Sequence, residues 1–173
     1  DVRTCILVMG VLCIIYVTLG GIEAVIWTDV IQVVVLLGGA VLMVISISGE
    51  TPGGFSGILN QADNEGKFAL NPSLDFSKTT IWTVFLGGLP ASFIKYGSDQ
   101  TVIQRYLTTK DEKASAKGIW TNAALTIPAT LLFFLVGAAL YVFYTNHPET
   151  LNPHLATNDA IVPYYIVDQL PNG

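Results

Sequence analysis

The run of residues from Gly21 to Val44 is long and apolar enough to cross a lipid bilayer, which takes about 20 residues of helix. Because lipid offers no partner for backbone polar groups, such a run can cross only as a helix. The run still carries a carboxylate, Asp29, and Gln32 follows one turn later on the same face. A charged side chain inside a membrane usually faces a bundle interior or a water-filled path. Asp29 is therefore expected to bind an ion, a proton or a partner charge.

Four apolar segments predict four membrane-spanning helices, at about 4–19, 22–48, 79–107 and 118–144. The composition agrees, since only 12% of the residues are charged, about half the share in soluble domains, and mean hydropathy is +0.56. The polar stretches predict loops at about 49–78, 108–117 and 145–173, the first of them with a short helix near 55–62. We expect an all-α integral membrane protein, and a piece of a longer chain, because the sequence begins at Asp1 without Met and ends in a turn-like Pro-Asn-Gly.

The basic residues predict the orientation in the membrane. Four of them fall between Arg105 and Lys117, whereas 49–78 holds two and 145–173 holds none. Cytoplasmic loops carry the excess of Lys and Arg. The loop at 108–117 is therefore expected in the cytoplasm and the other two loops outside. The expected location is the plasma (inner) membrane, crossed several times.

The first candidate site surrounds Asp29. Thr28 is its neighbour and Gln32 lies a turn away, so three oxygen-bearing side chains are close together. Hard oxygen donors of this kind suit Na+ better than sulfur or imidazole ligands would. Two alternatives remain open. Asp29 can bind a proton in place of Na+, or it can hydrogen-bond a neighbouring helix and only fix packing.

The second candidate site follows two weak points in the segment 79–107. Gly87-Gly88-Leu89-Pro90 and then Gly97 weaken the helical hydrogen-bond ladder. Irregular backbone in a membrane survives where it lines a cavity, and transporters place their substrate sites at such discontinuous helices. The candidate substrate-binding residues that follow the first weak point are Ser92, Lys95, Tyr96 and Asp99.

Lys95 has two interpretations. It is spaced i, i+4 from Asp99, so the two can form an ion pair with no further role. Alternatively, Lys95 faces the cavity and meets a polar or anionic solute. On the following span, Asn122, Thr126 and Thr130 are small polar residues of the kind that hydrogen-bond across membrane helices.

The sequence does not support several classes of function. No basic cluster predicts nucleic-acid binding, and Cys5 and Cys13 show no metal-binding spacing. No pair of titratable residues has spacing suited to acid–base catalysis, so an enzyme is not expected. The charge or carbonyl rings of a channel filter are also missing from the sequence.

Two stretches resemble the sodium:solute symporter family. They are GGIEAVIWTDVIQ at Gly20–Gln32 and YGSDQTVIQRYLTTKDEKASAKG at Tyr96–Gly118. The second is similar to the family's D/N-Q-x-x-x-Q-R-x-L pattern followed by a basic loop. The tail NDAIVPYYIVDQLPNG also resembles the family's segment before its next core helix. The match covers nearly the whole chain in order.

The resemblance implies a fragment of the leucine-transporter-like fold, built from two inverted repeats that give alternating access. It implies Na+-driven symport of a small solute, with lipid and the remaining helices of the full-length transporter as partners. In the family, the position of Asp29 lies on the sodium path or in a second sodium site. The principal sodium site is built from helices outside this chain. The resemblance also places part of the substrate cavity on the segment 79–107.

Two departures from sugar carriers bear on the solute. Lys95 stands where those relatives place an aromatic that stacks on the sugar, and Leu125 or Thr126 stands where they place a lysine. Both favour a sialic acid or a monocarboxylate over a glucose-type sugar. The alternative is a membrane scaffold or sensor domain that uses the transporter fold without transport.

Overall fold

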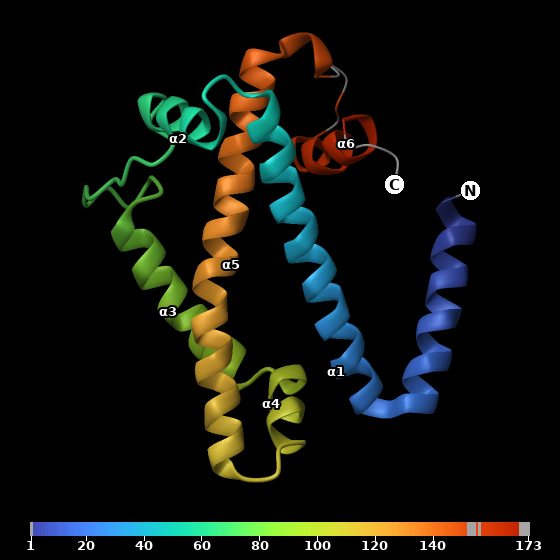
Figure 1. The fold of residues 1–173 in the computed structure, drawn as a ribbon. Helices are drawn as coiled ribbons and strands as arrows, with labels where there is room; N and C mark the ends of the chain where they lie inside the picture. Colours follow the sequence, from blue (N-terminus) through green and yellow to red (C-terminus); the bar gives the residue numbers. More distant parts are fainter. Residues whose placement is uncertain (1, 152–154, 156, 170–173) are drawn as a thin grey trace. The chain divides into compact units, whose positions relative to one another are not determined.

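The computed structural model describes residues 2–151, 155 and 157–169, and in these residues every regular element is a helix (Figure 1). Parts of the segment 145–173, namely 152–154, 156 and 170–173, lie outside the described residues. The chain forms two compact units, Asp1–Gly39 and Ala40–Gly173. The elements are α1 (Val2–Glu50), α2 (Gly54–Asn64), α3 (Ile81–Gly97), α4 (Gln100–Leu107), α5 (Glu112–Asn146), α6 (Ile161–Asp168) and two 3-10 turns, Pro148–Thr150 and Asn158–Ala160.

In the first unit, α1 turns back on itself at Gly21 (Figure 1). A continuous helix of 49 residues would be about 73 Å long, against a hydrocarbon core of about 30 Å. Gly21 interrupts it with φ 59° and ψ −155°, a conformation that side chains with a Cβ rarely adopt. The helical stretches on either side cover the spans expected at 4–19 and 22–48.

The second unit has its core at one end of α5, where the end of α1, α2 and α6 pack together. The buried apolar residues are Ala40, Met43, Val44, Ile47, Ile58, Ala62, Val136, Ala138, Ala139, Leu140, Val142, Phe143, Tyr144 and Tyr165. Tyr165 ties α6 into this core, because its ring meets Phe143 edge-on at 5.2 Å and its hydroxyl donates to Ser46 at 3.2 Å. None of the buried residues comes from α3 or α4.

The connector between α1 and α3, residues 51–80, is anchored to α5. Gln61 and Asn146 exchange two amide hydrogen bonds of 3.3 and 3.2 Å. The Tyr141 hydroxyl donates to Glu65 at 2.9 Å, and the Lys67 ammonium lies 3.6 Å from the centre of the same ring. This distance is that of a cation–π contact. The segment expected as a loop with a short helix near 55–62 therefore contains that helix, α2, and is fixed to α5 at several points.

The helix expected over 79–107 is two helices in the structure. The first weak point does not break it, since α3 runs through Gly87, Gly88 and Pro90. A proline removes one N–H from the ladder, and the neighbouring bonds maintain the helix. The interruption comes after Gly97, where the Asp99 side chain accepts the Thr101 amide at 2.8 Å and starts α4.

α5 starts earlier than expected, at Glu112, so the loop predicted at 108–117 is reduced to 108–111. The cause is Asp111, whose carboxylate accepts the Ala114 amide at 2.7 Å and caps the helix. Of the described helices, α1 and α5 are long and apolar enough to cross a membrane by length and composition.

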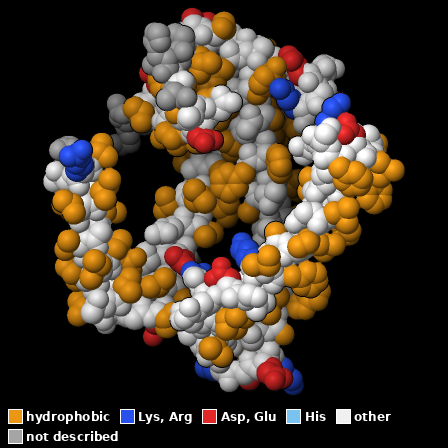
Figure 2. Space-filling model, turned by 180° about the vertical axis from the view of Figure 1, so that it is seen from behind, with side chains coloured by type: hydrophobic (Ala, Val, Ile, Leu, Met, Phe, Trp, Pro, Cys, Tyr) orange, Lys and Arg blue, Asp and Glu red, His pale blue; other side chains and the backbone are white. Residues whose placement is uncertain are grey.

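Large apolar side chains are exposed over the helices, as Figure 2 shows for one face. Phe93 on α3 is 75% exposed, and Trp120 and Phe134 on α5 are 76% and 72% exposed. Water disfavours so much exposed apolar surface. Such helices are expected to face lipid or further helices.

Candidate functional site

The candidate ion-binding residues all lie on α1 in the first unit. Thr28 and Asp29 are half-buried, and Gln32 is exposed. Helical spacing puts Gln32 one turn above the other two, so three oxygen-bearing side chains share one face. The Thr28 hydroxyl donates to the Ala24 carbonyl at 2.6 Å, which leaves the lone pairs of the hydroxyl oxygen able to face a cation.

Three of the candidate substrate-binding residues share one face at the end of α3. Ser92, Lys95 and Tyr96 are spaced i, i+3 and i+4, and all three are exposed, Tyr96 by 38%. They lie directly before the interruption between α3 and α4. Two hydroxyls and one ammonium are therefore presented together next to irregular backbone.

Asp99 has a different position from these three. Its carboxylate caps α4, and within the described residues Lys95 makes no ion pair with it. The Lys95 ammonium instead lies 5.9 Å from the centre of the Tyr96 ring. The i, i+4 pair is thus not formed, and the ammonium keeps its hydrogen-bonding capacity for another group.

One hydrogen bond joins this face to α5. The Asn122 side-chain amide donates to the Tyr96 hydroxyl at 3.1 Å. Thr126 behaves differently, since its hydroxyl donates to the Asn122 carbonyl of its own helix at 2.7 Å. Asn122 is therefore one of the expected polar residues that bonds across helices. Its type and its position on an apolar helix were the sequence signals, but its partner was not predicted.

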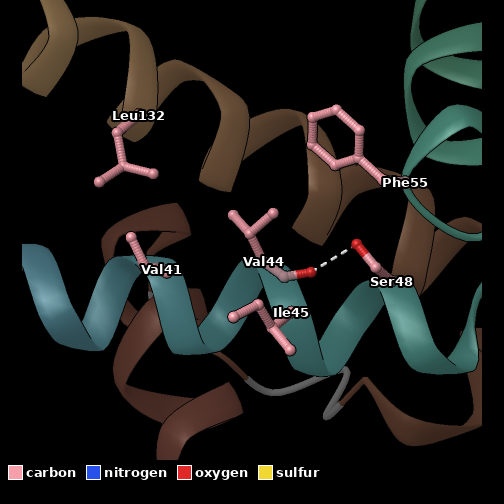
Figure 3. Close-up of a pocket in the computed structure, with 6 residues that line it drawn as sticks. All are labelled: Val41, Val44, Ile45, Ser48, Phe55 and Leu132. Atoms are coloured by element: carbon pink, nitrogen blue, oxygen red, sulfur yellow. Dashed lines mark hydrogen bonds between the residues drawn. The ribbon is translucent and has the colours of Figure 1, made fainter.

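Two cavities lie elsewhere in the second unit. The smaller, about 390 Å³, is apolar apart from Ser48, whose hydroxyl already donates to the Val44 carbonyl at 2.6 Å (Figure 3). The larger, about 1420 Å³, is lined by α2, the connector, α3 and α5, and mostly by apolar side chains. Its Lys67 and Tyr141 already contact each other. None of the candidate residues lines either cavity.

No group of three or more His, Cys, Asp or Glu side chains gathers in the part of the chain that the structure describes. Cys5 and Cys13 are both free and exposed. The candidate ion site is therefore one carboxylate with neutral oxygen donors. This is a weakly charged set of hard ligands, compatible with an alkali cation.

Comparison with known proteins gives a consistent result. A family model described as the sodium:solute symporter family matches residues 1–172. The sodium/sialic acid symporter NanT of Aliivibrio fischeri is 38% identical over 97% of this chain and 34% of its own length. The sodium/sialic acid symporter SiaT of Proteus mirabilis is 39% identical over the same shares. The sodium-dependent multivitamin transporter of Oryctolagus cuniculus is 32% identical over 98% of this chain.

A solved structure agrees with the sequence comparisons. It is the substrate-bound outward-open state of a Na+-coupled sialic acid symporter, described as having a novel Na+ site. It superposes with a TM-score of 0.85 at 34% identity, over 99% of this chain and 36% of the solved one. The chain therefore spans about a third of the length of these relatives.

Proposed function

We propose that this chain, which belongs to the sodium:solute symporter family, is part of a carrier that moves a small acidic solute by Na+-driven symport. The matched family and relatives are transporters, and the family is one of multi-pass membrane proteins. The observation that carries the proposal is the similarity over 99% of the chain to a Na+-coupled symporter. Because the chain spans about a third of that protein, the activity is proposed for the full-length carrier.

The proposed mechanism is alternating access in the leucine-transporter-like fold, with the two repeats exposing the solute site to each side in turn. Thr28, Asp29 and Gln32 contribute to a sodium path or second sodium site on α1. The half-buried position of Asp29 supports this, since a carboxylate removed from water gains more from a bound cation than an exposed one does.

The proposed solute is anionic. The exposed Lys95 ammonium makes no ion pair within the described residues, and Ser92 and Tyr96 present hydroxyls on the same face. Together they form a set of donors suited to a carboxylate. The sialic acid symporters among the relatives support the same class, and a monocarboxylate is the second candidate. Asp99, the fourth candidate, caps α4 with one of its carboxylate oxygens.

The function is tested by uptake into proteoliposomes that contain the full-length carrier. N-acetylneuraminic acid, lactate and glucose are each offered with an inward Na+ gradient and with K+ in its place. We expect Na+-dependent uptake of an acid and little uptake of glucose. Correctly inserted protein that takes up none of them in Na+ would instead favour a scaffold or sensor role.

The orientation proposed for this chain in the plasma (inner) membrane predicts which residues face the cytoplasm. In a carrier whose cysteines are replaced by serine, Ala114→Cys should react with an impermeant thiol reagent only when the cytoplasmic side is accessible. Asn64→Cys should react only from outside. Both side chains are exposed, so the side from which each reacts reports its side of the membrane. Reaction of both from one side would show that the spans between them are miscounted.

A further inference from the structure

The contact between Asn122 and Tyr96 is where α5 meets the face of α3 that carries the candidate solute residues. Asn122 lies 26 residues after Tyr96 in the sequence, and the bond between their side chains is 3.1 Å long. Tyr96 is the last residue of α3 before Gly97, directly at the interruption. Neither residue belongs to the hydrophobic core, so the contact is not part of the packing that holds the second unit together.

The direction of this hydrogen bond determines what the Tyr96 hydroxyl can offer. A phenol has one proton to donate and lone pairs that accept. Because the Asn122 amide donates to the oxygen, the bond uses a lone pair and leaves the phenol proton for another acceptor. A carboxylate oxygen is the strongest acceptor among common solute groups.

The position of the Tyr96 ring also affects Lys95. The Lys95 ammonium lies 5.9 Å from the ring centre, within the range of a cation–π attraction. A Tyr96 ring held by Asn122 therefore favours one conformation of the flexible Lys95 side chain. Two donors, the ammonium and the phenol, then belong to neighbouring residues at the same end of α3.

We propose that Asn122 is a positioning residue for solute recognition, which holds the Tyr96 hydroxyl as a donor beside Lys95 so that the pair selects a carboxylate. The proposal rests on the function proposed above and adds a residue from α5 to the solute site. Asn122 itself does not touch the solute. Its effect should appear in the KM for the acid, with the turnover rate nearly unchanged.

The experiment measures KM and kcat for N-acetylneuraminic acid and for lactate at saturating Na+, with the full-length carrier in proteoliposomes. Asn122→Leu keeps the size of the side chain and removes the donor. It should raise KM about three- to tenfold, the worth of one hydrogen bond, with kcat within about twofold. Asn122→Gln keeps the amide and should restore most of the affinity. Thr126→Val, one turn away on α5, is the matched control and should leave KM unchanged.

A double-mutant cycle tests whether Asn122 acts through Tyr96. Tyr96→Phe should raise KM to a similar extent, and adding Asn122→Leu to it should change little more. An unchanged KM in inserted Asn122→Leu protein, or fully additive effects in the double variant, would overturn the proposal. If Asn122→Leu fails to insert, Asn122→Ala, which also removes the donor, takes its place under the same expectations. A wild-type carrier without Na+-dependent uptake of either acid contradicts the proposed function itself, whereas wild-type uptake with unaffected variants contradicts only the role of Asn122.

Discussion

Replacing Lys95 by methionine should weaken transport of an acidic solute about tenfold or more. The substitution keeps the length of the side chain and removes the ammonium. A hydrogen bond to a charged group contributes about 1.5–3 kcal/mol, and about 1.4 kcal/mol corresponds to a factor of ten in affinity. The ammonium is exposed and makes no ion pair within the described residues, so its removal leaves no buried partner charge behind. The measurement is KM for the acid in proteoliposomes at saturating Na+.

Lys113→Met provides the matched control, because it removes the same charge from an exposed position in the first turn of α5. It should leave KM unchanged. An alternative role for Lys95 in folding predicts a different result, namely less inserted protein with normal KM. Normal affinity in inserted Lys95→Met protein would exclude the lysine from solute binding.

Replacing Asp29 by asparagine should raise the Na+ concentration needed for half-maximal uptake about tenfold or more, or reduce the number of Na+ ions moved per solute. Asparagine has the same shape and lacks the charge. The attraction between two unit charges about 4 Å apart is worth about 4 kcal/mol at an effective dielectric constant near 20, which is more than the roughly 1.4 kcal/mol of a tenfold change. The half-buried position of Asp29 reduces the screening that would weaken this effect at the surface. The measurement is the Na+ dependence of uptake at a fixed solute concentration.

Glu23→Gln is the control for this experiment, because Glu23 is an exposed carboxylate on the same helix. Its Na+ dependence should match that of the wild type. If Asp29 only fixes packing, Asp29→Asn will also keep the wild-type Na+ dependence at equal expression. If it binds a proton, the variant will change the pH dependence of uptake and leave the Na+ dependence as it was.

The fold class and the family could be predicted from the sequence, and both are confirmed. An apolar run long enough to cross a membrane must satisfy its own backbone hydrogen bonds, which a helix does. The presence of each helix can therefore be predicted from its own residues. Their ends were predicted less well, because they depend on single side chains. Asp99 interrupts the helix expected over 79–107, and Asp111 starts α5 six residues before the expected Gly118. Hydropathy alone does not detect such caps.

The candidate sites stay predictions, but the structure changes how their residues are related. Ser92, Lys95 and Tyr96 share a face that helical spacing already implied. The separation of Lys95 from Asp99 was not predictable, because the choice between an ion pair and a helix cap depends on backbone geometry after Gly97. The hydrogen bond from Asn122 to Tyr96 could not be predicted from the sequence either, since it depends on how α3 and α5 pack.

Because the connector is anchored to α5, its contacts cannot form until late in synthesis on the ribosome. Gln61 can bond to Asn146 only after 85 more residues have been synthesised. At about 5–20 residues per second, this delay is roughly 4–17 s. During that time Glu65 and Lys67 also lack Tyr141, because the last turns of α5 do not yet exist. The connector is therefore most open to proteases and to quality-control factors while it is being synthesised. Its protection should begin abruptly once α5 has entered the membrane.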